Sequence, residues 1–145
     1  GGLMSGINTG KVVTGGILAA VVFFAVDFVT FGFALKTEFE ANSTRLGLDP
    51  AAMNTPAAMV MWVVQEIAFG LLVVWTYAAI RPRFGPGPKT AIYAGLLFYV
   101  ATFLMMLSMA QGGIMPMSLF WKAAGFSLIS IVAGSIAGAW AYKEA

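Results

Sequence analysis

The stretch WTYAAIRPRFGPGPK, residues 75–89, ends a long apolar run and carries the densest basic cluster of the chain. It opens with Trp75 and Tyr77, whose rings have one polar edge and are of the kind enriched where acyl chains meet lipid headgroups. A short segment rich in Lys and Arg is costly to translocate and therefore stays in the cytoplasm. The stretch predicts the end of a membrane span and its orientation. Its basic residues are Arg81, Arg83 and Lys89.

Proline and glycine dominate the second half of this stretch. Pro82, Pro86 and Pro88 lack a backbone N–H and disfavour helix in the residue before each of them, while the glycines permit turn angles. We therefore expect residues 81–90 to form a cytoplasmic loop through which no helix continues. The basic residues of the loop are interpreted as a topology signal, with binding of anionic lipid headgroups as the alternative role.

The run YAAIRPRFGPGPKTA, residues 77–91, followed by IYAG, resembles a hallmark of a family of small, uncharacterised bacterial membrane proteins with four predicted helices. The resemblance covers most of the chain, up to the AGAWAYKE ending, although only the central loop is distinctive. It implies a four-helix protein of the bacterial inner membrane. It assigns no activity and no functional residue.

Composition places the chain in a bilayer. Hydrophobic residues make up 60% of it, charged residues 10%, and the mean hydropathy is +0.88. A soluble domain carries roughly 25% charged residues. The net charge of +2 does not indicate nucleic-acid binding, because the basic residues lie at the ends of apolar runs, where membrane orientation explains them.

The chain has no cysteine and no histidine. Thiol catalysis, disulfides, iron–sulfur ligation and Cys/His zinc sites are therefore excluded, and the usual protein ligand of haem is missing. We predict no cofactor. With no phosphate-binding loop and no nucleophile paired with histidine, we also predict that the protein is not an enzyme.

Four apolar runs are long enough to cross a membrane. At a rise of ~1.5 Å per residue, a run of about 24 residues spans about 36 Å, more than the ~30 Å of a bilayer core. Short connections force consecutive runs to be antiparallel. The sequence thus predicts an all-α fold, a polytopic membrane protein with a single antiparallel four-helix domain over residues 1–145. The predicted spans are residues 12–35, 57–80, 91–110 and 119–142.

The charges between the spans predict the topology. Segment 36–56 is polar and net acidic, which suits the periplasm. Lys and Arg number five on the predicted cytoplasmic side and three on the other. We expect a multi-pass protein of the bacterial inner membrane with both termini in the cytoplasm. Met4 is a candidate for the natural start, and residues 1–3 would then be a remnant.

Two carboxylates, Asp27 and Glu66, lie inside apolar runs. An ionisable group in mid-bilayer costs at least ~2.5–3.5 kcal/mol, so it is usually kept for a reason. Counting the helical rise from the middle of each span puts Asp27 about 5 Å and Glu66 about 4 Å to the periplasmic side of the midplane. Two acids at one depth in a low dielectric cannot both stay ionised cheaply, so at least one should be protonated or share a proton.

Polar residues of the facing helices are candidate members of this intramembrane site. Lys122 lies about 12 Å above the midplane, so its amine either reaches the headgroups or extends toward an acid. Three roles remain open for the two acids: a hydrogen-bonded link between helices, ion or proton translocation or the binding of a small cationic substrate, or a pair for an Arg or Lys of another subunit. The candidate neighbours are Gln65, Tyr99, Thr102, Ser127 and Ser130.

Small residues predict where helices approach closely. Ser130, Gly134 and Gly138 recur at helical spacing, and the two glycines form a GxxxG pair. Packing within the bundle is the favoured interpretation, with a dimer or a larger partner as the alternative. The methionines near the end of the third run are interpreted as packing residues and not as a copper site, because His and Cys are missing.

For function, the sequence favours a non-catalytic membrane component that acts by association. It would be an accessory subunit of a larger complex or a homo-oligomer, surrounded by membrane lipids and without a nucleic-acid partner. The alternative is a small transporter or channel in which Asp27 and Glu66 bind a proton or a cation.

Overall fold

The computed structural model describes residues 6–142, so Met4 and Lys143 lie outside the described residues. The described chain is all-α, as predicted, and no strand occurs between residues 6 and 142. Four helical stretches are long and apolar enough to cross a membrane, which makes this a multi-pass membrane protein: Thr9–Ala34, Pro56–Phe84, Pro88–Gln111 and Met117–Ala141. The elements are α1 (Thr9–Val29), the π-helical turn η2 (Thr30–Ala34), α2 (Lys36–Arg45), the 3-10 turn η3 (Pro50–Asn54), α3 (Pro56–Phe84), α4 (Pro88–Gln111) and α5 (Met117–Ala141).

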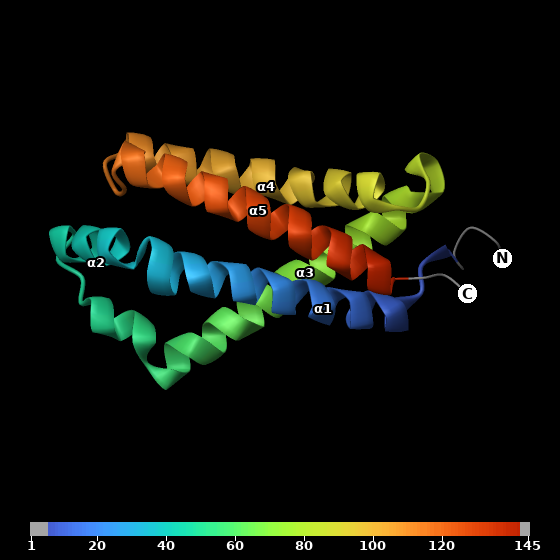
Figure 1. The fold of residues 1–145 in the computed structure, drawn as a ribbon, viewed down its shortest axis with the longest axis horizontal. Helices are drawn as coiled ribbons and strands as arrows, with labels where there is room; N and C mark the ends of the chain where they lie inside the picture. Colours follow the sequence, from blue (N-terminus) through green and yellow to red (C-terminus); the bar gives the residue numbers. More distant parts are fainter. Residues whose placement is uncertain (1–5, 143–145) are drawn as a thin grey trace.

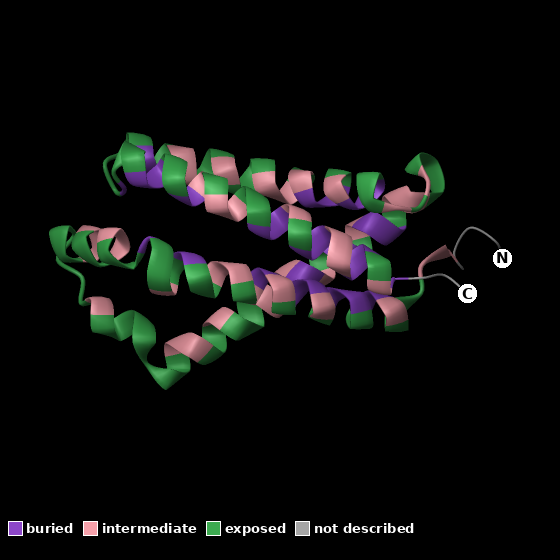
Figure 2. Ribbon diagram, viewed as in Figure 1, coloured by how far each residue is buried: buried purple, intermediate pink, exposed green. Residues whose placement is uncertain are grey.

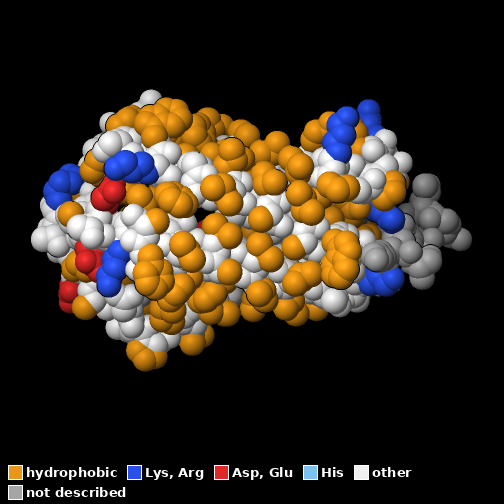
Figure 3. All heavy atoms as spheres, viewed as in Figure 1, with side chains coloured by type: hydrophobic (Ala, Val, Ile, Leu, Met, Phe, Trp, Pro, Cys, Tyr) orange, Lys and Arg blue, Asp and Glu red, His pale blue; other side chains and the backbone are white. Residues whose placement is uncertain are grey.

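The four long helices form a bundle that is tight at one end and spread at the other (Figure 1). The most extensive contacts join α1 to α3 and α1 to α5, followed by those between α4 and α5. Contacts between α3 and α4 are fewer, and α3 crosses behind α1 and leaves the other helices toward the α2 end. Apolar side chains cover the middle of the molecule, and Lys and Arg gather at both ends (Figure 3). This distribution is the one expected of a protein that crosses a bilayer.

Two tyrosines tie the tight end together. The Tyr142 hydroxyl accepts a hydrogen bond from the Asn8 backbone N–H at 3.0 Å, and the Tyr77 hydroxyl accepts one from the Gly87 N–H at 3.1 Å. The two rings pack edge to face with their centroids 6.0 Å apart. The start of α1, the end of α5 and the turn between α3 and α4 are therefore held in one network.

The turn between α3 and α4 is shorter than the predicted loop over residues 81–90. Helix α3 continues through Pro82 to Phe84, and α4 already begins at Pro88. A proline inside a helix loses a hydrogen bond and bends the chain, but only two helical residues follow Pro82, so a bend there displaces little of α3. The turn occurs at Gly85 and Gly87, which have φ angles of 86° and 125°, values that L side chains rarely adopt.

The first membrane helix is irregular near its end. Helix α1 changes to the π-helical turn η2, and Leu35 breaks the helix with φ −118° and ψ 14° before α2 begins. The predicted polar segment 36–56 therefore contains α2 and η3. Arg45 Nη2 donates to the Gly113 carbonyl oxygen at 2.9 Å, which attaches α2 to the turn between α4 and α5.

Two hydrophobic cores stabilise the two ends (Figure 2). The core at the tight end contains residues of all four long helices. The core at the α2 end contains no residue of α3, whose buried residues all lie between Gly70 and Ala78. The first half of α3 is consequently outside both cores. The second core is made of Leu35, Ala110, Met115, Leu119, Phe120 and Ala123.

Glycines allow the backbones of α1, α3 and α5 to touch. A Cβ atom at Gly70 would overlap the Gly16 carbonyl oxygen, and one at Gly138 would lie 2.9 Å from the Gly15 carbonyl oxygen. Gly134 faces the ring of Phe23. The GxxxG pair therefore packs inside the bundle, as the favoured interpretation had it.

Replacement of Gly70 by alanine should destabilise the protein, because the added methyl group must push α1 and α3 apart. We expect Gly70→Ala to lower the free energy of unfolding by about 1–3 kcal/mol. The matched control is Gly125→Ala in α5, where a Cβ would meet nothing within 4 Å. Thermal unfolding of both variants in the same detergent tests this, and equal midpoints would show that the glycine contact does not hold the helices together.

Candidate functional site

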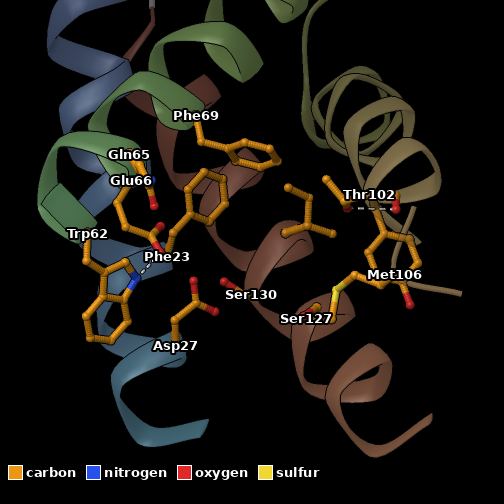
Figure 4. A pocket seen from close by; sticks show the side chains of 12 residues that line it. Phe23, Asp27, Trp62, Gln65, Glu66, Phe69, Thr102, Met106, Ser127 and Ser130 are labelled. Carbon is orange, nitrogen blue, oxygen red and sulfur yellow. Dashed lines mark hydrogen bonds between the residues drawn. The ribbon is translucent and has the colours of Figure 1, made fainter. Parts of the chain in front are cut away.

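A cavity of about 270 Å³ lies between the two cores and is lined by all four long helices (Figure 4). Helix α3 provides the largest part of one wall, and α4 and α5 provide the facing wall. Asp27 and Glu66 both line it, together with polar and aromatic side chains. The lining residues are Phe23, Asp27, Trp62, Gln65, Glu66, Phe69, Tyr99, Thr102, Met106, Ser127, Ser130 and Ile131.

The two acids approach each other from different helices. Asp27 on α1 and Glu66 on α3 are half-buried, and their carboxyl groups interact with each other. Trp62 Nε1 donates a hydrogen bond to Glu66 Oε1 at 3.0 Å. The hydroxyl of Ser130 on α5 lies beside the Asp27 carboxyl group. The depth estimate, which put both acids at nearly one level, agrees with this contact.

Aromatic rings line the cavity beside both acids, with Phe23 and Phe69 toward the tight end and Trp62 toward the α2 end. The rings of Phe23 and Phe69 pack edge to face with centroids 5.6 Å apart, and Phe69 makes the same contact with Phe98 at 5.6 Å. The indole of Trp62 is held against Phe24 at 4.9 Å. Because each ring is fixed by another ring, the shape of this wall is set independently of any bound molecule.

The facing wall is weakly polar. The Tyr99 hydroxyl donates to the Ala124 carbonyl oxygen at 2.8 Å, and the Thr102 hydroxyl donates to the Phe98 carbonyl oxygen at 3.0 Å. Both hydroxyl hydrogens are thus used by the backbone, and the oxygens keep their capacity to accept. This wall offers acceptors and no positive charge.

Lys122 lies outside the cavity. Its Nζ atom forms an ion pair with Glu38 Oε2 on α2 at 3.1 Å. The sequence left open whether the Lys122 amine extends outward or toward an acid of the cavity, and in the structure it extends outward. Among the residues that line the cavity there is neither Lys nor Arg, so this wall supplies no cation to the acid pair.

The basic residues of the α3–α4 turn belong to the tight end and not to the cavity. The Arg81 guanidinium lies 6.0 Å from the centroid of the Tyr142 ring, and the Lys89 amine lies 5.9 Å from that of Tyr93. Arg83 is exposed. This arrangement fits an end of the bundle that meets lipid headgroups.

The cavity unites most of the residues that the sequence proposed for an intramembrane site. Asp27, Gln65, Glu66, Tyr99 and Thr102 line it, and so do both predicted serines. The aromatic wall and Met106 were not predicted. Trp62 precedes Glu66 by four residues and Phe23 precedes Asp27 by four, so each ring lies one helical turn from an acid, and this spacing is a signal that the sequence contained.

The donor set does not match a metal centre. Among residues 6–142, no group of three or more Asp, Glu, His or Cys side chains is close enough to hold a metal ion. Divalent hard cations usually take six or more oxygen ligands, several of them carboxylates. The pair of acids is more suited to a proton or to a monovalent cation.

The hydrogen bond from Trp62 should stabilise the pair. We expect Trp62→Phe, which keeps a ring beside Phe24, to lower the free energy of unfolding by about 0.5–1.5 kcal/mol, the net contribution of a typical intramolecular hydrogen bond. The control is Trp75→Phe, because that ring is 51% exposed on the surface that meets lipid. Thermal unfolding in detergent compares the two variants. A larger loss for Trp75→Phe would contradict the role given to the indole N–H.

No protein-family model, no curated protein and no solved structure matches this chain.

Proposed function

We propose that this protein is a small transporter or channel that binds a proton or a cation at Asp27 and Glu66. The observation that carries the proposal is the contact between two carboxyl groups in a cavity whose lining has no basic side chain. Two carboxylates in a low dielectric require a compensating positive charge. When the chain itself does not supply that charge at the site, a proton or a bound cation must do so.

Three features favour binding over a purely structural link. A structural link between helices needs only a hydrogen bond and no space beside it. These acids instead border a cavity of about 270 Å³. The acid on α1 lies just before the π-helical turn η2, and such turns are frequent at functional sites. The small-residue surfaces, which were candidates for contact with a partner, are used inside the bundle.

The association role is the second candidate. The observation that favours it is the first half of α3, where no residue between Pro56 and Phe69 is buried and where Met61 is 56% exposed. Lipid or another subunit would cover this surface. In that role the acid pair would receive its positive charge from an Arg or Lys of the partner.

For location we propose the bacterial inner membrane, with both termini and the α3–α4 turn in the cytoplasm. The support is the excess of Lys and Arg near that turn and the mixture of acidic and basic side chains at the α2 end. The positive-inside rule assigns the former to the cytoplasm.

Flux through the purified protein in liposomes tests the main proposal. We expect a flux of H⁺, Na⁺ or K⁺ that the double variant Asp27→Asn, Glu66→Gln abolishes, because it removes the charge that attracts the cation. Glu38→Gln is the control, since it neutralises an acid that pairs with Lys122 outside the cavity. Undiminished flux in the double variant would overturn the proposal. If the native protein assembles with a partner and carries no flux, the association role is supported instead.

The absence of cysteine permits a direct test of the topology. A single cysteine at Asn54, before α3, should react with a membrane-impermeant maleimide in intact cells from which the outer membrane has been removed. A single cysteine at Pro86, in the α3–α4 turn, should react only after the membrane is opened. Labelling in the reverse order would show that the orientation is inverted.

A further inference from the structure

We propose that the cavity binds a small lipophilic organic cation, such as a quaternary ammonium ion, that reaches it sideways from within the membrane. This inference rests on the proposed function, because it names the ligand of the same acid pair. Three independent properties of the cavity carry it: its aromatic wall, the direction in which it is open, and its size.

The aromatic wall favours an organic cation over a metal ion. The rings of Phe23, Trp62 and Phe69 line the cavity beside the two carboxyl groups. Aromatic faces attract cations that have lost their water shell, and aromatic residues around a negative charge are how proteins recognise quaternary ammonium groups. A divalent metal ion would need a shell of oxygen ligands in place of these rings.

The cores close the cavity at both ends of the bundle. Toward the tight end lie Phe23 and Ile131, which are buried in the first core, and toward the α2 end lies Met106, which packs on the second core. Both ends of the cavity are therefore lined by side chains that belong to a hydrophobic core or pack on one.

The side of the bundle is open instead. Helices α3 and α4 contact each other less than α1 contacts α3 or α5 and less than α4 contacts α5, and the second core does not include α3. Gln65 on α3 and Thr102 on α4 are both cavity-lining and exposed. An inorganic ion does not dissolve in hydrocarbon, whereas a lipophilic cation partitions into a membrane and can use this route.

The volume sets an upper limit on the ligand. Pockets for drug-sized molecules measure about 300–1,000 Å³, and this cavity measures about 270 Å³. One aromatic ring with a trimethylammonium group fits such a space. A cation with four phenyl rings does not.

Binding of benzyltrimethylammonium to the full chain in lipid nanodiscs tests the inference, with empty nanodiscs to correct for partition into lipid. We expect saturable binding that becomes at least tenfold weaker in the double variant Asp27→Asn, Glu66→Gln and is unchanged in Glu38→Gln. The neutral carbon isostere neopentylbenzene and the bulky tetraphenylphosphonium should not bind. Equal binding of the neutral isostere, or no effect of the double variant, would overturn the inference.

A second measurement does not depend on the acid variants being folded. Because the chain has no cysteine, a single cysteine at Thr102 can be labelled with N-ethylmaleimide in nanodiscs. We expect saturating benzyltrimethylammonium to slow this reaction at least fivefold. A cysteine at Leu104, on the same helix but absent from the cavity lining and 56% exposed, is the control and should react at the same rate with and without the ligand. Equal protection at both positions would contradict binding in the cavity.

The two proposals can fail separately. If the acids are needed for flux of H⁺, Na⁺ or K⁺ but benzyltrimethylammonium neither binds nor protects Thr102→Cys, the ligand class is wrong and the proposed function stands. If neither flux nor binding depends on the acids, both proposals are wrong. If binding depends on the acids and no cation crosses the liposome membrane, the ligand class stands and transport does not.

Discussion

Contact between helix backbones at glycine positions is the constraint on which this structure depends. Gly16 meets Gly70, and Gly15 meets Gly138, so α1 is pressed against α3 and α5 near the tight end. In lipid, apolar side chains gain little by leaving the acyl chains, and close packing of backbones is what remains to hold helices together. The place of these glycines decides where the helices touch. Beyond it α3 diverges from the other long helices (Figure 1).

The cavity is a consequence of this divergence. With α3 directed away from α4, the space between the two cores is filled only in part, and the acids border what is left empty. A structure that needed these acids for cohesion alone would bury them against donors on all sides. Here Glu66 has one indole donor and Asp27 one serine hydroxyl beside it, which leaves part of each carboxyl group facing the cavity.

Hydropathy and charge were sufficient to predict the four spans and the all-α class, because both depend on composition over long windows. The local geometry of the helices was harder to predict from the sequence. Pro82 suggested a helix end, but the helix continues past it for two residues, and a bend so close to the end of α3 displaces little of the helix. The π-helical turn η2 contains no proline and no charged residue from which it could have been predicted. The acid pair could be inferred from depth alone. The aromatic wall depends on how α3 crosses α1, and the outward direction of Lys122 depends on the position of Glu38 on α2. No periodicity in the sequence specifies either arrangement.

The spread of α3 also has a meaning for the bilayer around the protein. At the tight end the helices occupy a compact cross-section, and at the α2 end the same helices, with α2 and η3, extend over a wider one (Figure 1). The molecule is thus a wedge that displaces more lipid from one leaflet than from the other. Such a shape fits a curved bilayer better than a flat one.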